Sequence, residues 1–157
     1  MKKLFLTLLA ILLITGIASA AGIPYYVDAK TGPEVWITSV YNNSGGTLDV
    51  GDVVVWDISS STGDNDNYVT TTTTASTFLV AGVVYPLDIA AANEGTIAIM
   101  GPVAVDCAST VAAGERICSS GAAGEATDVQ CHVGDAFGYA LTASSSSSCM
   151  VNIFGKR

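Results

Sequence analysis

Four cysteines are the residues whose types and spacing most clearly indicate a particular chemistry. Cys107, Cys118, Cys131 and Cys149 are even in number and are separated by 11, 13 and 18 residues. No C-x-x-C pair occurs, so the spacing is not that of a zinc site or a thioredoxin-type redox centre. In a chain that begins like an exported protein, the even count predicts two disulfide bonds formed in an oxidising compartment.

Four cysteines allow three pairings. Cys107 and Cys149 belong to apolar segments with strand-like alternation, whereas Cys118 and Cys131 flank a Gly/Ala-rich turn. We therefore favour the pairing Cys107–Cys149 with Cys118–Cys131. Each bridge should contribute about 3 kcal/mol, largely because it restricts the unfolded chain.

The remaining polar residues do not form a pattern typical of catalysis. His132 is the only histidine and lies beside a cysteine that we expect to be oxidised. No G-x-S-x-G elbow occurs, and the Gly121–Gly124 stretch lacks the lysine of a phosphate-binding loop. Most carboxylates stand in turn-like contexts rather than as an acid–base pair: Asp49, Asp52, Asp64, Asp66, Asp88, Asp128 and Asp135. We expect a protein that is not an enzyme.

Two binding chemistries remain open. Asp64 and Asp66 in the polar loop Ser59–Asn67 could be calcium ligands, but no correctly spaced glycine and glutamate complete a calcium loop, and turn formation is the better explanation of the loop. We expect no other cofactor. Trp36 and Trp56 could form a platform for stacking carbohydrate rings, although core packing is the more economical interpretation.

Strand-like segments separated by turn signals fill the chain from residue 35 to residue 157. No amphipathic helical pattern competes with them, and the spacing predicts one all-β domain, a β-sandwich or β-barrel. The expected strands are Val35–Tyr41, Asp52–Ile58, Tyr68–Thr74, Phe78–Tyr85, Thr96–Cys107, Val111–Ile117, Phe137–Ala143 and Cys149–Phe154.

The stretch Thr96–Cys107 is the expected core strand. Its odd-numbered residues, apart from Gly101, are branched or apolar, and its even-numbered residues are smaller or mixed, which is the alternation of a strand with one buried face. Gly101-Pro102 interrupts the pattern and fits a bulge, a sheet edge, or the end of one strand and the start of another.

The N-terminus has the three regions of a secretory signal peptide. Lys2-Lys3 precede the apolar run Leu4–Ile17, and Ala18-Ser19-Ala20 forms a small-residue cleavage site. Residues 1–20 are therefore expected to be removed; an uncleaved anchor is the alternative, although the run is shorter than a membrane span of about 20 residues.

Residues 21–34 then form an extended N-terminal arm with turns. Its apolar side chains are unusual for a free terminus, and we expect them to dock on the protein's own body or on a neighbouring subunit: Ile23, Tyr25, Tyr26 and Val27.

The net charge of the chain limits the classes of partner that it can bind. The formal net charge is −8 and becomes −10 when Lys2 and Lys3 are lost with the signal peptide. Such an acidic chain repels phosphates and anionic lipids, which excludes nucleic acid as a partner and favours a soluble product without stable membrane insertion. The expected partners are other copies of the chain or a protein lattice.

From Gly51 onward the order of features resembles small phage capsid decoration proteins and related β-rich head proteins. The segments that carry the resemblance are Gly51–Asp57, Asn67–Val69, Ala81–Val84, Gly95–Ile99, Gly101–Val105, Ala112–Arg116 and Gly138–Ala143. The resemblance implies a compact β-barrel or sandwich that binds other copies or a lattice without catalysis. The signal peptide and the four cysteines depart from that pattern.

Three functions are compatible with these observations. The first is a secreted or cell-surface structural protein that self-associates into a filament, layer or coat. The second is a capsid decoration protein of a phage virion, and the third is an extracellular carbohydrate- or surface-binding module. We place the structural protein first, because a β fold used for assembly outside the cell fits both the signal peptide and the cysteines.

Overall fold

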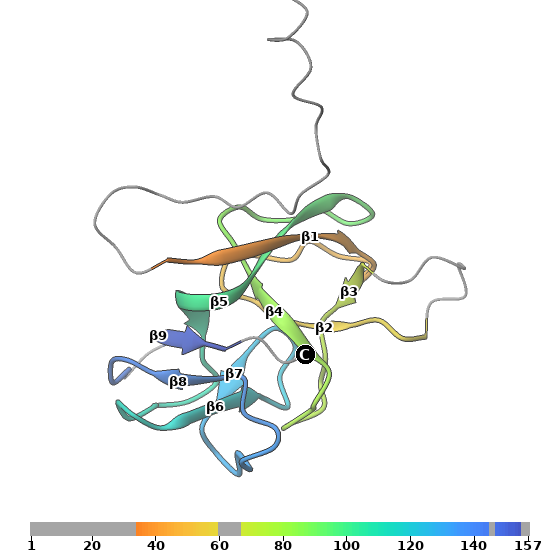
Figure 1. Ribbon diagram of the computed structural model, residues 1–157. Coiled ribbons are helices and arrows are strands. Elements are labelled where there is room, and N and C mark those ends of the chain that lie inside the picture. The colour runs from red at the N-terminus through yellow and green to blue at the C-terminus, as the bar shows by residue number, and fades with distance from the viewer. Residues whose placement is uncertain (1–33, 60–66, 145–146, 155–157) are drawn as a thin grey trace, which may run out of the picture.

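The computed structural model describes residues 34–59, 67–144 and 147–154, and these residues contain strands but no helix. The all-β fold predicted from the sequence is confirmed (Figure 1). The predicted signal peptide and the predicted arm up to residue 33 lie outside the described residues. The nine strands are β1 (Trp36–Asn42), β2 (Val53–Trp56), β3 (Tyr68–Thr70), β4 (Val80–Val84), β5 (Glu94–Asp106), β6 (Arg116–Ser119), β7 (Ala126–Thr127), β8 (Gly138–Ala140) and β9 (Ser148–Ile153).

Five strands form a closed barrel. They follow the order β1-β3-β2-β4-β5, and pairing between β5 and β1 closes the ring. The β1–β3 pair is parallel, and the other four pairs are antiparallel. Closure leaves the barrel without a sheet edge, which removes the unpaired backbone groups that promote edge-to-edge aggregation.

Strand β5 connects the barrel to a second sheet. Its first half pairs with β1 and β4, and Gly101–Asp106 pair instead with β9, from which the order continues through β8 and β6 to β7. Gly101-Pro102 therefore does not separate two strands, because both residues lie inside the single 13-residue strand β5. Figure 1 shows β5 turning there from the barrel into the lower sheet.

Gly101 makes this turn possible. Its φ of +104° is one that L side chains rarely adopt, and a Cβ at this position would collide with the carbonyl oxygen of Glu34. The backbone just before β1 thus lies directly against β5 at its bend. The register between β1 and β5 also shifts here, because Trp36 pairs with Met100 whereas Ile37 pairs with Ala98.

Two apolar clusters fill the molecule. One fills the barrel: Val40, Leu48, Val54, Val69, Val84, Ile89 and Ile97. The other joins the outside of the barrel to the second sheet: Val53, Val55, Val80, Val83, Ala98, Val103, Val105, Cys107, Val111, Ile117, Ala126, Phe137, Ala140, Cys149, Val151 and Ile153. Strand β2 contributes Val54 to the first cluster and Val53 and Val55 to the second, so both of its faces are buried. This explains its continuous valine run, because alternation disappears when neither face meets water.

The structure pairs the cysteines as the sequence analysis favours. Cys107 is bridged to Cys149 and Cys118 to Cys131, with Cα–Cα distances of 6.2 and 5.6 Å that suit disulfides. The first bridge joins Cys107, the residue that follows β5, to Cys149 inside β9, whose cross-strand partner is Val105. Both bridges belong to the second sheet, so the barrel is held by packing and backbone pairing.

Some predicted strands are shorter in the structure. Strand β3 ends at Thr70, so the rest of the threonine run is not in a strand. Strand β4 begins at Val80, and Phe78, which the sequence places in a buried strand, is 70% exposed. Threonine and phenylalanine favour strands in general, but these residues have no neighbouring strand to pair with.

Asn42 is a buried amide at the end of β1. Its Nδ2 donates to the carbonyl oxygens of Gly46 (2.7 Å) and Ile89 (2.8 Å), and its Oδ1 accepts from the Ser44 N–H (2.9 Å). These bonds fix the turn after β1 and attach it to the segment before β5. Because Asn42 is fully buried, the N-x-S sequence here is a structural turn rather than an exposed glycosylation site.

Replacing this amide should be costly. Asn42→Ala removes the bonds that the amide donates to the Gly46 and Ile89 carbonyl oxygens and leaves the Ser44 N–H without its side-chain acceptor, and we expect the free energy of unfolding to fall by about 2–3 kcal/mol. Urea denaturation measures the loss. Asn43→Ala is the matched control, because the Asn43 side chain is exposed and donates its hydrogen bond at the surface, to the Asp57 carboxylate. Equal losses in the two variants would contradict a structural role for Asn42.

Candidate functional site

The second sheet has one face against the core and one face toward solvent. Val103 and Val105 of β5 and Val151 of β9 point to the core, and the alternate positions point outward. Strand β9 shows this alternation through all six of its residues. We call the outward positions the outer sheet face: Pro102, Ala104, Arg116, Tyr139, Leu141, Met150, Asn152 and Phe154.

Cross-strand pairing brings these residues into two rows. Asn152 is the partner of Pro102 on one side and of Tyr139 on the other, and Tyr139 is in turn the partner of Arg116. In the next row Ala104 is opposite Met150, and the Leu141 N–H donates to the Met150 carbonyl oxygen at 2.8 Å. Residues in one row on the same face are in contact range, so four strands present one continuous surface.

This surface is apolar where a solvated sheet face would normally be polar. Tyr139 is 45% exposed, Leu141 50% and Met150 40%. The Tyr139 and Phe154 rings also contact each other, with centroids 5.4 Å apart. At the barrel border of the face, the cross-strand partners Trp36 and Met100 are 45% and 40% exposed. Several exposed apolar side chains on one sheet face make this face a candidate interaction site.

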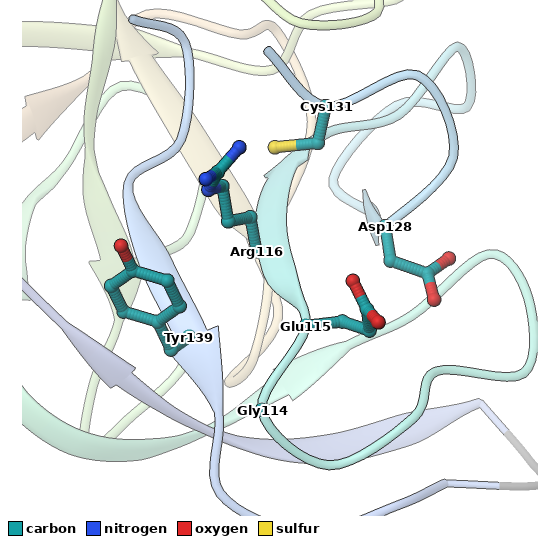
Figure 2. Close-up of a pocket in the computed structure, with 6 residues that line it drawn as sticks. All are labelled: Gly114, Glu115, Arg116, Asp128, Cys131 and Tyr139. Carbon is teal, nitrogen blue, oxygen red and sulfur yellow. The ribbon is translucent and has the colours of Figure 1, made fainter. Parts of the chain in front are cut away.

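A polar pocket adjoins the outer sheet face at β6. It has a volume of about 320 Å³ and is lined by Gly114, Glu115, Arg116, Asp128, Cys131 and Tyr139. Figure 2 shows the Arg116 side chain between Tyr139 and Cys131, with the carboxylates of Glu115 and Asp128 together on the other side. Arg116 is the single lysine or arginine among the residues that the structure describes. The face therefore ends in a positive charge on a body that is otherwise acidic.

A further group of carboxylates lies where the loop before β2 meets the end of β5. The Asp52 Oδ2 accepts from the Asp49 N–H at 2.9 Å, and Asp106 lies against Gly51. Burial raises the pKa of the Asp52 carboxyl above its ordinary 3.8; the bond from Asp49 opposes this, and nearby carboxylates add to it. Burial and, next, the charge of Glu125 raise the pKa of Asp106. Within the described residues, no group of three or more acidic, histidine or cysteine side chains is arranged to hold a metal ion.

This cluster predicts a dependence of stability on pH. A carboxyl with a raised pKa in the folded state stabilises the fold fully below 3.8, and that contribution is lost as the pH rises through the raised folded value. We therefore expect the contribution of Asp52 and Asp106 to the free energy of unfolding to grow as the pH falls from 7 toward 4. Asp106→Asn should flatten this slope and stabilise the fold at pH 7 by less than about 1 kcal/mol, because solvent screens a partly exposed charge.

Thermal melts from pH 4 to pH 7 test this expectation. Asp135→Asn serves as the control, because it makes the same chemical change at a carboxyl outside the cluster. A slope that is as steep in Asp106→Asn as in the parent chain would contradict the assignment.

The structure separates the residues that the sequence singled out. His132 is exposed, and its carbonyl oxygen accepts from the N–H groups of Asp135 and Ala136 in a turn. Trp36 is half-exposed on β1, whereas Trp56 packs against the barrel cluster, so the two do not form one exposed aromatic row. The calcium candidates Asp64 and Asp66, and the arm residues Ile23, Tyr25, Tyr26 and Val27, lie outside the described residues.

The outer sheet face was not predicted from the sequence. Its signal is in Phe137–Ala143, where bulky and small residues alternate. The small residues Gly138 and Ala140 face the core, while Tyr139 and Leu141 face solvent. The reason is space: a Cβ on Gly138 would approach the Val151 Cγ1 to 2.6 Å. Apolar bulk at outward positions, opposite small core-facing residues, could have identified the surface.

No family profile and no curated protein sequence matches the chain. Among solved structures, the chain is similar to the crystal structure of the head fiber gp8.5 N base in bacteriophage phi29, with a TM-score of 0.55 and 13% sequence identity. The similarity covers 74% of this chain and 93% of that chain. At this identity it shows a shared fold, in agreement with the β-rich head-protein architecture that the sequence resemblance implies. In the part of the chain that the structure describes, no helix is long and apolar enough to cross a membrane.

Proposed function

We propose that the protein is a structural, non-enzymatic component of the outside of a phage head. The observation that carries this proposal is the fold shared with nearly the whole length of a phage head-fibre base. A shared fold does not by itself transfer a role, so the surface of this chain must support the same conclusion. The supporting feature is the outer sheet face, whose exposed apolar side chains a protein partner would cover.

The proposal places the virion role ahead of the secreted lattice that the sequence analysis put first. The two roles share their main physical requirement, which is repeated contact between protein surfaces. Two disulfide bridges and the predicted N-terminal signal segment suit a chain that is oxidised outside the cytoplasm, and in these features the chain departs from the small phage head proteins that it resembles. The expected partners are other copies of the chain and a protein lattice.

The proposal is tested on particles released by cells that carry the gene. The particles are banded on a density gradient and analysed by mass spectrometry, and gold-labelled antibody against the chain is applied to the banded particles. We expect the chain in the particle band and the gold on the heads. Recovery of the chain only from the soluble fraction would overturn the virion role.

A secreted self-assembling protein is the second candidate, favoured by the signal segment at residues 1–20. It predicts filaments or layers in the particle-free fraction by electron microscopy. The carbohydrate-binding alternative gains no support from the positions of Trp36 and Trp56, because only Trp36 has a substantially exposed ring.

A further inference from the structure

The outer sheet face begins where the N-terminal arm joins the body. The Val35 Cα lies 3.0 Å from the position of a Cβ on Gly101, and Pro102 is the first residue of the face. Residues 21–33 are therefore attached at the border of this face.

The arm is long enough to reach a neighbouring molecule. Six residues lie between Val27 and Glu34, and a fully extended chain from the first of these two residues to the second spans about 25 Å. Four strands at the usual spacing are only about 14 Å across. The segment Ile23–Val27 can therefore leave its own body and lie across the second sheet of an adjacent copy.

The chemistry of the segment complements that of the face. Ile23, Tyr25, Tyr26 and Val27 are apolar, and Asp28 follows them directly. Arg116 stands at one end of the outer sheet face, beside Glu115 and Asp128 in the polar pocket, and Asp106 follows the outward positions of β5 at the opposite border. Between these ends, the other residues of the face carry no carboxylate, whereas the described body carries all of the chain's 14 carboxylates except Asp28, Asp64 and Asp66. Two such acidic bodies repel each other, so contact between copies is most favourable where apolar area is large and negative charge is absent.

We propose that the outer sheet face of one copy binds the segment Ile23–Val27 of a second copy. Aromatic side chains such as Tyr25 and Tyr26 bury large areas and are frequent anchors of interfaces. The inference rests on the proposed structural role and adds the contact by which copies associate. When the arm of one copy binds the outer sheet face of another, the two copies associate without an extensive complementary interface between their acidic bodies.

Photo-crosslinking tests the contact directly. The full chain, exported and oxidised, carries p-benzoylphenylalanine in place of Tyr26 and is prepared in light and ¹⁵N-labelled forms that are mixed. We expect crosslinks between light and heavy chains, joined to peptides that contain Tyr139, Leu141 or Met150. Crosslinks within one chain only, crosslinks to other surfaces, or no crosslinks at all would overturn the proposal.

A matched pair of leucine variants provides a second test. Leu141 lies on the outer sheet face and is 50% exposed, and Leu87 lies in the loop before β5 and is 75% exposed. Leu141→Asp should weaken self-association, measured by analytical ultracentrifugation, about tenfold or more, since loss of an anchor residue commonly costs that much. Leu87→Asp adds the same charge and should change the self-association constant less than threefold. Equal effects, or a parent chain that is monomeric at every concentration, would overturn the proposal.

Particle binding by the same variants separates this inference from the proposed function. If Leu141→Asp no longer self-associates but still binds heads, both proposals stand. If the parent chain forms light–heavy crosslinks but never bands with particles, the virion role fails and the arm contact stands. If the parent chain bands with particles but forms no crosslinks to the outer sheet face, the arm contact alone fails.

Discussion

Replacement of both Cys107 and Cys149 by alanine is expected to lower the free energy of unfolding by about 4 kcal/mol. The bridge closes a loop of 42 residues, and in the chain-entropy account the stabilisation grows with the logarithm of that length. Both cysteines are at least 95% buried in the cluster between the barrel and the second sheet. Alanine is chosen because a buried serine hydroxyl would add a desolvation cost of its own.

The second bridge provides the control. Cys118–Cys131 closes only 13 residues, and replacement of this pair by alanine should cost about 3 kcal/mol, less than the loss of the longer loop. Guanidinium denaturation of the two double variants beside the parent chain measures both losses. A loss below about 1 kcal/mol for the Cys107/Cys149 pair, or a larger loss for the shorter loop, would contradict this account of how the second sheet is held.

Gly101→Ala is expected to be comparably damaging, with a loss of about 3–4 kcal/mol. Its φ of +104° strains any other residue, and the added Cβ would meet the carbonyl oxygen of Glu34, which cannot move without displacing the start of β1. The substitution acts at the one point where β5 passes from the barrel to the second sheet. It should therefore loosen both the β1–β5 pairing and the β5–β9 pairing.

Gly46→Ala is the matched comparison. A Cβ at Gly46 meets no atom within 4 Å, so this variant should stay within about 0.5 kcal/mol of the parent chain. Chemical denaturation gives the two free energies, and amide hydrogen exchange shows whether protection is lost on both sides of residue 101. If the free energies of unfolding of Gly101→Ala and Gly46→Ala differ by less than 1 kcal/mol, the bend does not depend on glycine.

Local patterns predict much of this fold. The alternation in Ser148–Ile153 and the break at Gly101-Pro102 correspond to a half-buried strand and to the bend of β5. These patterns do not predict that β5 belongs to two sheets, because the alternation of residues in a strand does not indicate which neighbouring strand it pairs with. The bulge beside Trp36 and the closure of β5 onto β1 depend on pairing between segments about 60 residues apart.

The candidate site is harder to predict than the fold. Its residues come from four strands, and Met150, Leu141 and Tyr139 each look like ordinary core residues in their local sequence. Only the space available decides otherwise: Gly138 and Ala140 fill the narrow core side of β8, and the bulky neighbours must face outward. The arm, by contrast, was predicted from its apolar composition, and its role in assembly stays a prediction.

Electron cryo-microscopy of particles with and without the gene tests the central claim most directly. If the protein is a structural component of the head exterior, particles from the intact gene should show additional density on the outside of the head that fits the barrel and its second sheet. Particles from the deletion should lack this density, and complementation with the parent chain should restore it. Identical heads from both sources, with the chain found only in the medium, would contradict the account.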